Sequence, residues 1–232
     1  MKNVAADGRL ARRKVQTRAA LLEAAYVEMS SSGIDSVKIR DITDRADVGF
    51  GTFYNYFESR DALAGQVLDC VIHDMGRRNI KVTAGLRERE PALVIPTSMR
   101  LFIHEAVSST MWQWWAKRPD LLCDRMRDGF GPFGRRDMRD GIRIGVLALD
   151  PANIETCWGQ ANWMLVGAIH DIYEGKLVAE ESCLIVESIM RMMGVERELA
   201  HHVSSTPLPN YPAANVDWTF DLAAFRAGSS GA

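Results

Sequence analysis

The sequence predicts an all-α protein, with an N-terminal three-helix domain followed by a larger helical domain. Apolar residues recur three and four positions apart along most of the chain, which is the spacing of one face of an α-helix. Hydrophobic residues make up 47% and charged residues 25% of the 232 residues, as in an ordinary globular protein. Eight prolines and 18 glycines exclude a collagen-like or low-complexity chain.

The composition also bears on compartment and metal content. No run of about 18 apolar residues lacks a charge or a strong breaker, and the N-terminus has no apolar segment. We therefore expect no membrane span, no secretory signal and a cytoplasmic protein. Because the four cysteines are far apart and form no C-x-x-C pair, we expect reduced thiols, no structural metal and no cofactor.

Basic residues are concentrated at the N-terminus. Residues 1–20 contain six basic residues and one acidic residue, whereas the whole chain has a formal net charge of -2. A basic arm can lie along a phosphate backbone, because each neutralised phosphate releases condensed counterions. A solvated tail that only aids solubility fits the same charges.

The first helix is expected over residues 17–32. Leu21, Ala25 and Met29 are four residues apart, and Gly33 follows at the place where a left-handed residue ends a helix.

A helix-turn-helix is expected next, with a second helix over 37–45 and a third over 50–57. The turn of about four residues contains Gly49, and such a turn lets the following helix enter a major groove of DNA. Phe53 and Phe57 are expected to face the core. Three hydroxyls and one amide remain on the exposed side, from Thr52, Tyr54, Asn55 and Tyr56. Such groups are suited to phosphate oxygens and base edges.

The segment from Ile42 to Leu63, ITDRADVGFGTFYNYFESRDAL, resembles the DNA-binding domain of TetR-family (tetracycline-repressor-like) transcriptional regulators. That domain typically has an isoleucine, an alanine four residues later, a valine, a Gly-Thr-x-Tyr-x-x-Phe helix, then Ser-Lys/Arg and a leucine. Each has a counterpart here at the same spacing. Asp47 departs from the usual turn glycine and Gly49 from the usual Ser/Thr cap. The resemblance is strong over residues 12–65, and the remainder is compatible with the family.

The resemblance implies which side chains contact DNA. Thr52 and Tyr54 match family residues that touch base edges or phosphates, and Tyr56 and Arg60 match phosphate contacts. Arg40 matches a side chain that reaches DNA from the preceding helix. The full expected set is Arg12, Arg13, Lys14, Arg40, Gly51, Thr52, Tyr54, Asn55, Tyr56 and Arg60. Packing between helices is the alternative for Tyr54 and Tyr56.

Further helices are expected downstream. A fourth helix, capped by Ser59, reaches about residue 80, and in the family it links the DNA-binding head to a ligand-binding body. Helices are also expected over 92–109 and 134–146, with a glycine-rich loop at 128–134. Three tryptophans lie within four residues: Trp112, Trp114 and Trp115. They cannot all face one side of a helix, so at least one is expected to line a cavity, an interface or the surface. Ordinary core packing is the alternative.

Two long helices, over 151–174 and 180–203, are apolar nearly all round. One molecule's core does not easily cover both faces, so we expect a homodimer with a four-helix interface on a twofold axis. The residues expected there are Ala161, Leu165, Ala168, Ile185, Ile189 and Met193.

The expected organisation is a helix-turn-helix head at 1–62, an effector-binding and dimerisation body at 63–205, and a partly docked, partly disordered tail at 206–232. Three aromatic residues are expected to clamp the tail against the body: Trp218, Phe220 and Phe225.

Enzyme chemistry is not expected. No G-x-S-x-G elbow occurs, and a di-iron bundle needs two Glu-x-x-His pairs, whereas only the segment from Glu198 to His201 fits. His201 and His202 are adjacent near the end of a helix, and the other three histidines stand singly among apolar neighbours: His73, His104 and His170.

The resemblance implies a dimeric transcriptional regulator, a repressor that a small, largely apolar effector releases from a pseudo-palindromic double-stranded DNA operator. The expected effector-binding residues are Phe102, His104, Met111, Trp112, Trp115, Asn162, Trp163, Met164 and His170. A constitutive DNA-binding or architectural dimer with no small-molecule ligand is the alternative, and the sequence leaves both open.

Overall fold

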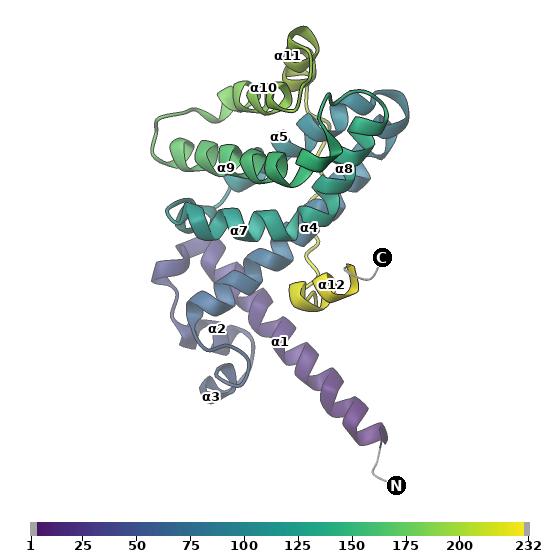
Figure 1. The fold of residues 1–232 in the computed structure, drawn as a ribbon. Helices are drawn as coiled ribbons and strands as arrows, with labels where there is room; N and C mark the ends of the chain where they lie inside the picture. The colour runs from purple at the N-terminus through teal and green to yellow at the C-terminus, as the bar shows by residue number, and fades with distance from the viewer. Residues whose placement is uncertain (1–3, 230–232) are drawn as a thin grey trace. The chain divides into compact units, whose positions relative to one another are not determined.

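A computed structural model describes residues 4–229 of the chain, and every regular element in that range is a helix (Figure 1). The chain forms two compact units. The head unit consists of Met1–Val71 and Asn215–Ala232, and the body unit consists of Ile72–Ala214. No helix within residues 4–229 is both long and apolar enough to cross a membrane.

The head unit begins with the helices α1 (Val4–Ser32), α2 (Ile39–Arg45), α3 (Phe50–Phe53) and the first part of α4 (Arg60–Arg89). Its core is formed by side chains that the helical spacing predicted, among them Leu21, Leu22, Met29, Ile42, Phe53 and Phe57. Ser59 caps α4 as predicted, because its hydroxyl accepts a hydrogen bond from the Ala62 backbone N–H at 3.0 Å.

Several helix bounds differ from the sequence prediction. α1 begins at Val4 rather than near residue 17, so the basic arm is helical from that point on. α3 ends at Phe53, and α4 continues to Arg89 rather than to about residue 80. The apolar spacing that defined the prediction marks only the part of α1 that packs on the core, and exposed turns precede that part. α3 is instead shorter than predicted, because residues 54–56 form a turn.

The body unit holds the rest of α4 and the helices α5 (Val94–Ala106), α6 (Thr110–Ala116), α7 (Pro119–Gly129), α8 (Gly131–Arg143), α9 (Ile154–Tyr173), α10 (Ser182–Met192) and α11 (Arg197–Ser205). α9 contacts α5, α6, α7, α8 and α10, so it is the central helix of this unit. The three tryptophans of α6 are all buried: Trp112, Trp114 and Trp115.

The expected loop at 128–134 is wrong, because α7 runs to Gly129 and α8 starts at Gly131. The glycines serve close packing rather than a flexible loop. A Cβ atom at Gly134 would collide with the Trp158 ring, so only a glycine lets α8 and α9 approach at this point.

The second of the two long helices is divided in two. α10 ends at Met192 and α11 begins at Arg197. Gly194, between them, has a left-handed φ of 82°, which is the conformation that favours glycine. Glu196 caps α11, since its carboxylate accepts hydrogen bonds from Glu198 N and Leu199 N at 2.8 and 3.2 Å.

Residues 206–229, which we call the C-terminal strap, begin on the body unit. Tyr211 Oη donates a hydrogen bond to the Met75 carbonyl at 3.4 Å, and Arg78 Nη1 donates to the Pro212 carbonyl at 3.1 Å. The Arg78 guanidinium lies 4.3 Å from the centre of the Tyr211 ring and also pairs with Asp74 at 2.7 Å. This part of the strap is therefore fixed to α4.

The strap ends in the head unit, where it forms α12 (Leu222–Ser229). Arg18 Nη1 and Cys70 Sγ both donate to the Phe220 carbonyl, at 3.3 and 3.8 Å. The Trp218 ring packs on Tyr26. The predicted clamp exists, but it holds the strap to the head unit rather than to the body.

Candidate functional site

The turn between α2 and α3 has the tight conformation of a helix-turn-helix. Asp47 has φ 53°, and it is the only non-glycine residue within 4–229 with a positive φ. Val48 N donates to the Thr43 carbonyl at 3.0 Å, which closes the turn. Gly49 occupies the N-cap of α3 without a side-chain hydrogen bond. Of the two departures from the family pattern, Asp47 therefore has a left-handed backbone, whereas Gly49 has an extended backbone that any residue adopts.

α3 turns one face to the core and the other to solvent. Phe53 and Phe57 are buried, with ring centres 5.7 Å apart, as predicted. Tyr54 is 54% exposed, and its ring makes edge contacts with Phe50 and Phe53 at 5.8 and 5.3 Å. Helix packing does not bury Tyr54, so its hydroxyl is available to a partner.

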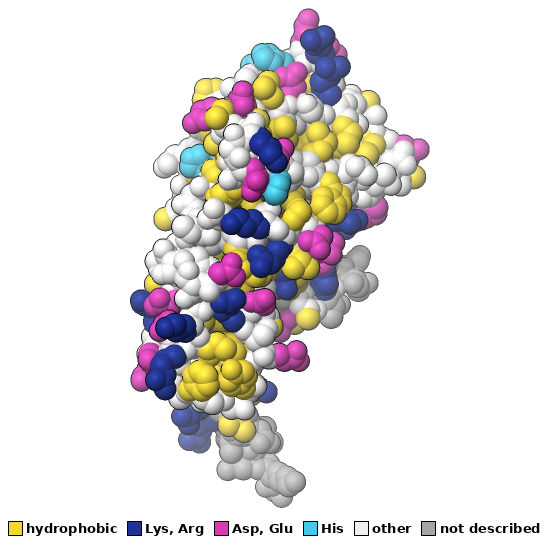
Figure 2. Space-filling model, turned by 90° about the vertical axis from the view of Figure 1, so that its left-hand side faces the viewer, with side chains coloured by type: hydrophobic (Ala, Val, Ile, Leu, Met, Phe, Trp, Pro, Cys, Tyr) yellow, Lys and Arg dark blue, Asp and Glu magenta, His cyan; other side chains and the backbone are white. Residues whose placement is uncertain are grey.

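The other predicted DNA-binding residues fall into two groups. The exposed ones are Arg12, Arg13, Lys14, Arg40, Gly51 and Asn55, and the half-buried ones are Thr52, Tyr56 and Arg60. Arg60 is already engaged, since Nη1 donates to the Asp35 carbonyl at 2.9 Å and Nε lies 3.5 Å from Asp61 Oδ1. Over the head unit, Figure 2 shows Lys and Arg side chains beside a group of hydrophobic side chains, with acidic side chains among them.

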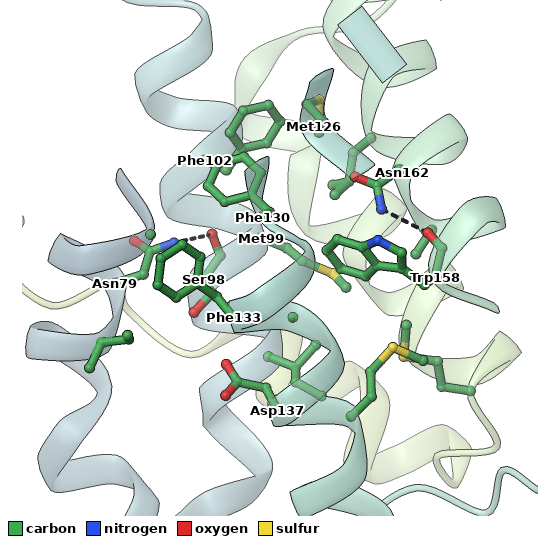
Figure 3. Close-up of a pocket in the computed structure, with 18 residues that line it drawn as sticks. Asn79, Ser98, Met99, Phe102, Met126, Phe130, Phe133, Asp137, Trp158 and Asn162 are labelled. Atoms are coloured by element: carbon green, nitrogen blue, oxygen red, sulfur yellow. Dashed lines mark hydrogen bonds between the residues drawn. The ribbon is translucent and has the colours of Figure 1, made fainter. Parts of the chain in front are cut away.

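A cavity lies in the body unit between α4, α5, α7, α8 and α9 (Figure 3). Its volume is about 80 Å³, and one water molecule needs about 10–15 Å³. The walls are mainly apolar, and their aromatic members are Phe102, Phe130, Phe133 and Trp158. The cavity can therefore hold a small organic molecule.

Two buried asparagines line this cavity, from α4 and α9. Asn162 Nδ2 donates to the Trp158 carbonyl at 2.7 Å, and Asn79 Nδ2 donates to the Ser98 carbonyl at 3.3 Å. Neither Oδ1 atom has a hydrogen-bond partner among residues 4–229. Figure 3 shows the two side chains on opposite sides of the cavity.

One carboxylate also lines the cavity. Asp137 is 9% exposed, and its Oδ1 lies 2.9 Å from Arg87 Nη2 and 3.1 Å from Arg136 Nη2. The indole nitrogen of Trp158 donates to the Arg127 carbonyl at 3.1 Å, so it is already used.

The sequence predicted only two of the cavity residues, Phe102 and Asn162. Met111, Trp112 and Trp115 are buried but do not line this cavity, although the Trp112 ring is 5.8 Å from that of Phe102. The remaining candidates lie outside it, with His104 and Trp163 exposed and Met164 and His170 half-buried. A large aromatic or thioether side chain on a helix does not reveal which neighbouring helix it faces.

One cavity residue that the sequence analysis did not predict has a weak signal in the sequence. Gly76 lies inside the long helix α4, and a Cβ atom there would collide with the Phe133 ring. A glycine in a helix interior is unfavourable and often indicates close approach of another group.

The residues predicted to form a dimer interface lie largely in the core of the body unit. Five are buried in the single chain, namely Ala161, Leu165, Ala168, Ile189 and Met193, and Ile185 is half-buried. The reason is that α9 is covered by five other helices. The exposed sides of α9 and α10 instead carry Trp163, Leu184 and Met192, which are 44%, 54% and 37% exposed.

None of the four cysteines lines the cavity. The four cysteines are free thiols, and burial raises the pKa of Cys70 to about 12 and that of Cys123 to about 11. Within the described residues no group of three or more His, Cys, Asp or Glu side chains could hold a metal ion.

Comparisons with known proteins agree with this architecture. Residues 21–67 match the family model of bacterial regulatory proteins of the tetR family, and residues 90–206 match that of the tetracyclin repressor-like C-terminal domain. The HTH-type transcriptional repressor DhaR of Mycobacterium sp. (strain GP1) is 44% identical over 45 residues, which are 19% of this chain and 23% of DhaR. The chain thus matches less than a quarter of the length of that curated relative.

Two solved structures of RolR are similar over most of the chain. RolR in complex with its ligand resorcinol is 27% identical, with a TM-score of 0.77, and the match covers 87% of this chain and 100% of RolR. RolR without ligand is 26% identical, with a TM-score of 0.76, and covers 84% of this chain and 100% of RolR. The helix-turn-helix, the helical body and these matches together show that the chain belongs to the TetR family of bacterial transcriptional regulators.

Proposed function

We propose that the protein is a dimeric repressor that binds a pseudo-palindromic DNA operator through α3 and releases it when a small molecule occupies the body cavity. The observation that carries the proposal is the cavity, with apolar walls and two buried amide oxygens that have no hydrogen-bond partner within the described part of the chain. A constitutive DNA-binding protein has no need of such a space, because unpartnered buried acceptors lower stability.

The exposed surface of α3 supports the DNA-binding part of the proposal. Tyr54 and Asn55 project hydroxyl and amide groups into solvent, and Arg40 and the basic residues of α1 supply exposed cations. A helix-turn-helix dimer reads two half-sites whose centres are about 34–36 Å apart. Two copies are therefore required for tight, specific binding.

We place the dimer surface on the exposed sides of α9 and α10. Leu184 and Met192 are eight residues apart on α10, which is close to two helical turns, and Trp163 lies on the neighbouring helix α9. The position of Gly167, one turn after Trp163, has open space around it, so a second copy can approach closely. A second copy of this face would remove three large apolar side chains from water.

The proposal that a small molecule acts as the effector rests on the cavity and on the structural similarity to RolR. RolR is described with resorcinol as its ligand, which makes resorcinol the first compound to test. Repression needs only a modest coupling, since about 1–3 kcal/mol between two sites changes affinity about 5- to 150-fold.

The test is a selection of DNA duplexes from a random pool by the full-length protein, followed by titration of the selected duplex with and without resorcinol. We expect a pseudo-palindromic consensus and a loss of affinity of at least about fivefold when resorcinol is saturating. A duplex whose affinity is insensitive to resorcinol and to other small aromatic compounds would favour the constitutive alternative.

A further inference from the structure

Two buried polar atoms of the cavity have no hydrogen-bond partner among residues 4–229, and both are acceptors, the Oδ1 atoms of two asparagines. Asn162 is 1% exposed and Asn79 is 8% exposed. Each amide nitrogen donates to a main-chain oxygen, which fixes the orientation of the amide and leaves the Oδ1 atom without a partner among residues 4–229. A buried acceptor gains most from a group that donates a hydrogen to it.

The lining of the cavity offers an anion no cationic side chain. Among residues 4–229, Asp137 is the only charged residue that lines it. The nearby cations Arg87 and Arg136 are paired with Asp137, and neither lines this cavity. A carboxylate or phosphate group on a ligand would therefore meet the two unpartnered amide oxygens, and the described residues that line the cavity include no cation to bind it.

The walls favour a flat ring. Phe102 and Phe130 meet edge to face, with ring centres 5.3 Å apart, and Phe133 and Trp158 supply further aromatic surface. Aromatic rings pack on such surfaces in offset or edge-to-face geometries. The small volume of the cavity favours a single ring.

From these observations we infer that the cavity takes a neutral, single-ring aromatic molecule whose hydroxyl groups donate hydrogen bonds, and that Asn162 Oδ1 selects for such a donor. The inference rests on the proposed function in treating the cavity as a ligand site. It goes further because it assigns the chemical class of the ligand and the residue that recognises the ligand. Ser98 also lines the cavity, and its hydroxyl can donate or accept.

Calorimetric titration of the full-length protein with four probes of similar size tests the inference. The probes are resorcinol with two donors, 3-methoxyphenol with one, 1,3-dimethoxybenzene with none, and benzoate as the anion. We expect affinity to fall in that order over the first three, by about tenfold for each donor lost, and we expect benzoate not to bind.

Three variants separate the role of Asn162 from general packing. Asn162→Leu removes the acceptor at similar size, so resorcinol should lose about tenfold in affinity while 1,3-dimethoxybenzene is unchanged. Asn162→Asp keeps acceptor oxygens and should keep the preference for donors. Asn153→Leu, at an exposed asparagine whose side chain makes no capping bond, is the matched control and should behave as the parent.

The outcomes distinguish the inference from the proposed function. Equal binding of resorcinol and 1,3-dimethoxybenzene by the parent, tight binding of benzoate, or no binding of any probe would overturn the inference, whether or not the variants fold. Operator release is measured separately with whichever probe binds. If resorcinol binds with the expected preference and does not release DNA, the inference stands and the proposed function fails.

Discussion

The indole of Trp218 lies on the ring of Tyr26, with ring centres 5.1 Å apart and planes inclined by 45°, so the end of the chain packs against its first helix. The neighbouring carbonyl of Phe220 accepts hydrogen bonds from Arg18 and Cys70. Arg18 Nε also donates to Gln66 Oε1 at 3.1 Å, which joins α1 to α4. The strap is thus part of the packing of the head unit.

Removal of the residues after Ala214, which include the head-unit part of the strap, should expose Cys70. This thiol is 1% exposed, and burial raises its pKa to about 12, so at pH 8 almost none of it is the reactive thiolate. In a variant truncated after Ala214, we expect Cys70 to react with iodoacetamide at pH 8, as followed by mass spectrometry of peptides.

Cys123 is the internal control, because it is buried in the body unit and should stay protected in both proteins. If Cys70 remains protected after truncation, the strap does not cover it in solution.

Substitution of Tyr54 should weaken operator binding. Tyr54→Phe keeps the edge contacts with Phe50 and Phe53 and removes only the hydroxyl. We expect a loss of at least about 1 kcal/mol, the scale of one hydrogen bond to a charged group, with no change in unfolding temperature. Fluorescence anisotropy with the selected duplex measures it, and parental affinity would show that this hydroxyl does not contact DNA.

The basic residues of α1 should determine part of the salt dependence of DNA binding. Replacing Arg12, Arg13 and Lys14 with Gln is expected to lower the slope of log K against log salt by up to about 2.7, since each phosphate contact contributes about 0.9. Sequence preference should be retained, because phosphate contacts position the protein rather than specify bases. The control replaces three exposed cations of the body unit with Gln, namely Arg143, Lys176 and Arg197, and should leave the slope unchanged.

Relief of the left-handed backbone at Asp47 should stabilise the head unit. Glycine adopts φ 53° without a Cβ clash, so Asp47→Gly is expected to raise the free energy of unfolding by up to about 1 kcal/mol. Asp47→Ala removes the same charge but keeps a Cβ atom, and it should lower stability instead. Urea unfolding compares the two, and equal effects would mean that charge rather than backbone strain is responsible.

Charge on the exposed side of α10 should separate the protomers. Leu184→Glu places a carboxylate at a position that is solvent-exposed in the protomer, so folding stability should change by no more than about 0.5 kcal/mol while the dimer dissociates. Ala168→Glu would bury an unpaired charge in the protomer core and should unfold the body, at a cost of several kcal/mol.

Sedimentation velocity and circular dichroism distinguish the two results. Leu199→Glu, at an exposed leucine of α11, is the control and should remain a folded dimer. A Leu184→Glu protein that stays dimeric would place the interface elsewhere.

The head unit was predicted better from the sequence than the cavity, because the residue patterns that define its helices and caps are local. The four-residue spacing of Phe53 and Phe57 and the cap at Ser59 each depend on residues within one or two turns. The cavity could not be predicted in the same way. Asn79, Asp137 and Asn162 are brought together from three helices, and no spacing along the chain encodes that arrangement.

The prediction for α9 was limited by a symmetric pattern. Ala168 and Trp163 lie on different sides of a helix that is apolar nearly all round, and periodicity alone does not decide which side faces the protomer's own core. The last long helix is divided at Gly194, which has a left-handed φ. The sequence alone does not show whether a glycine ends a helix or is tolerated within it.

The discontinuous head unit affects how the protein can be cut and fused. A fragment that stops at Val71 contains the whole helix-turn-helix, yet it lacks the residues from Asn215 onward that pack on α1. An isolated DNA-binding fragment would therefore need that second segment, joined through a linker. Likewise, a reporter fused behind α12 would be attached to the head unit and not to the body unit, although α12 follows the body in the gene.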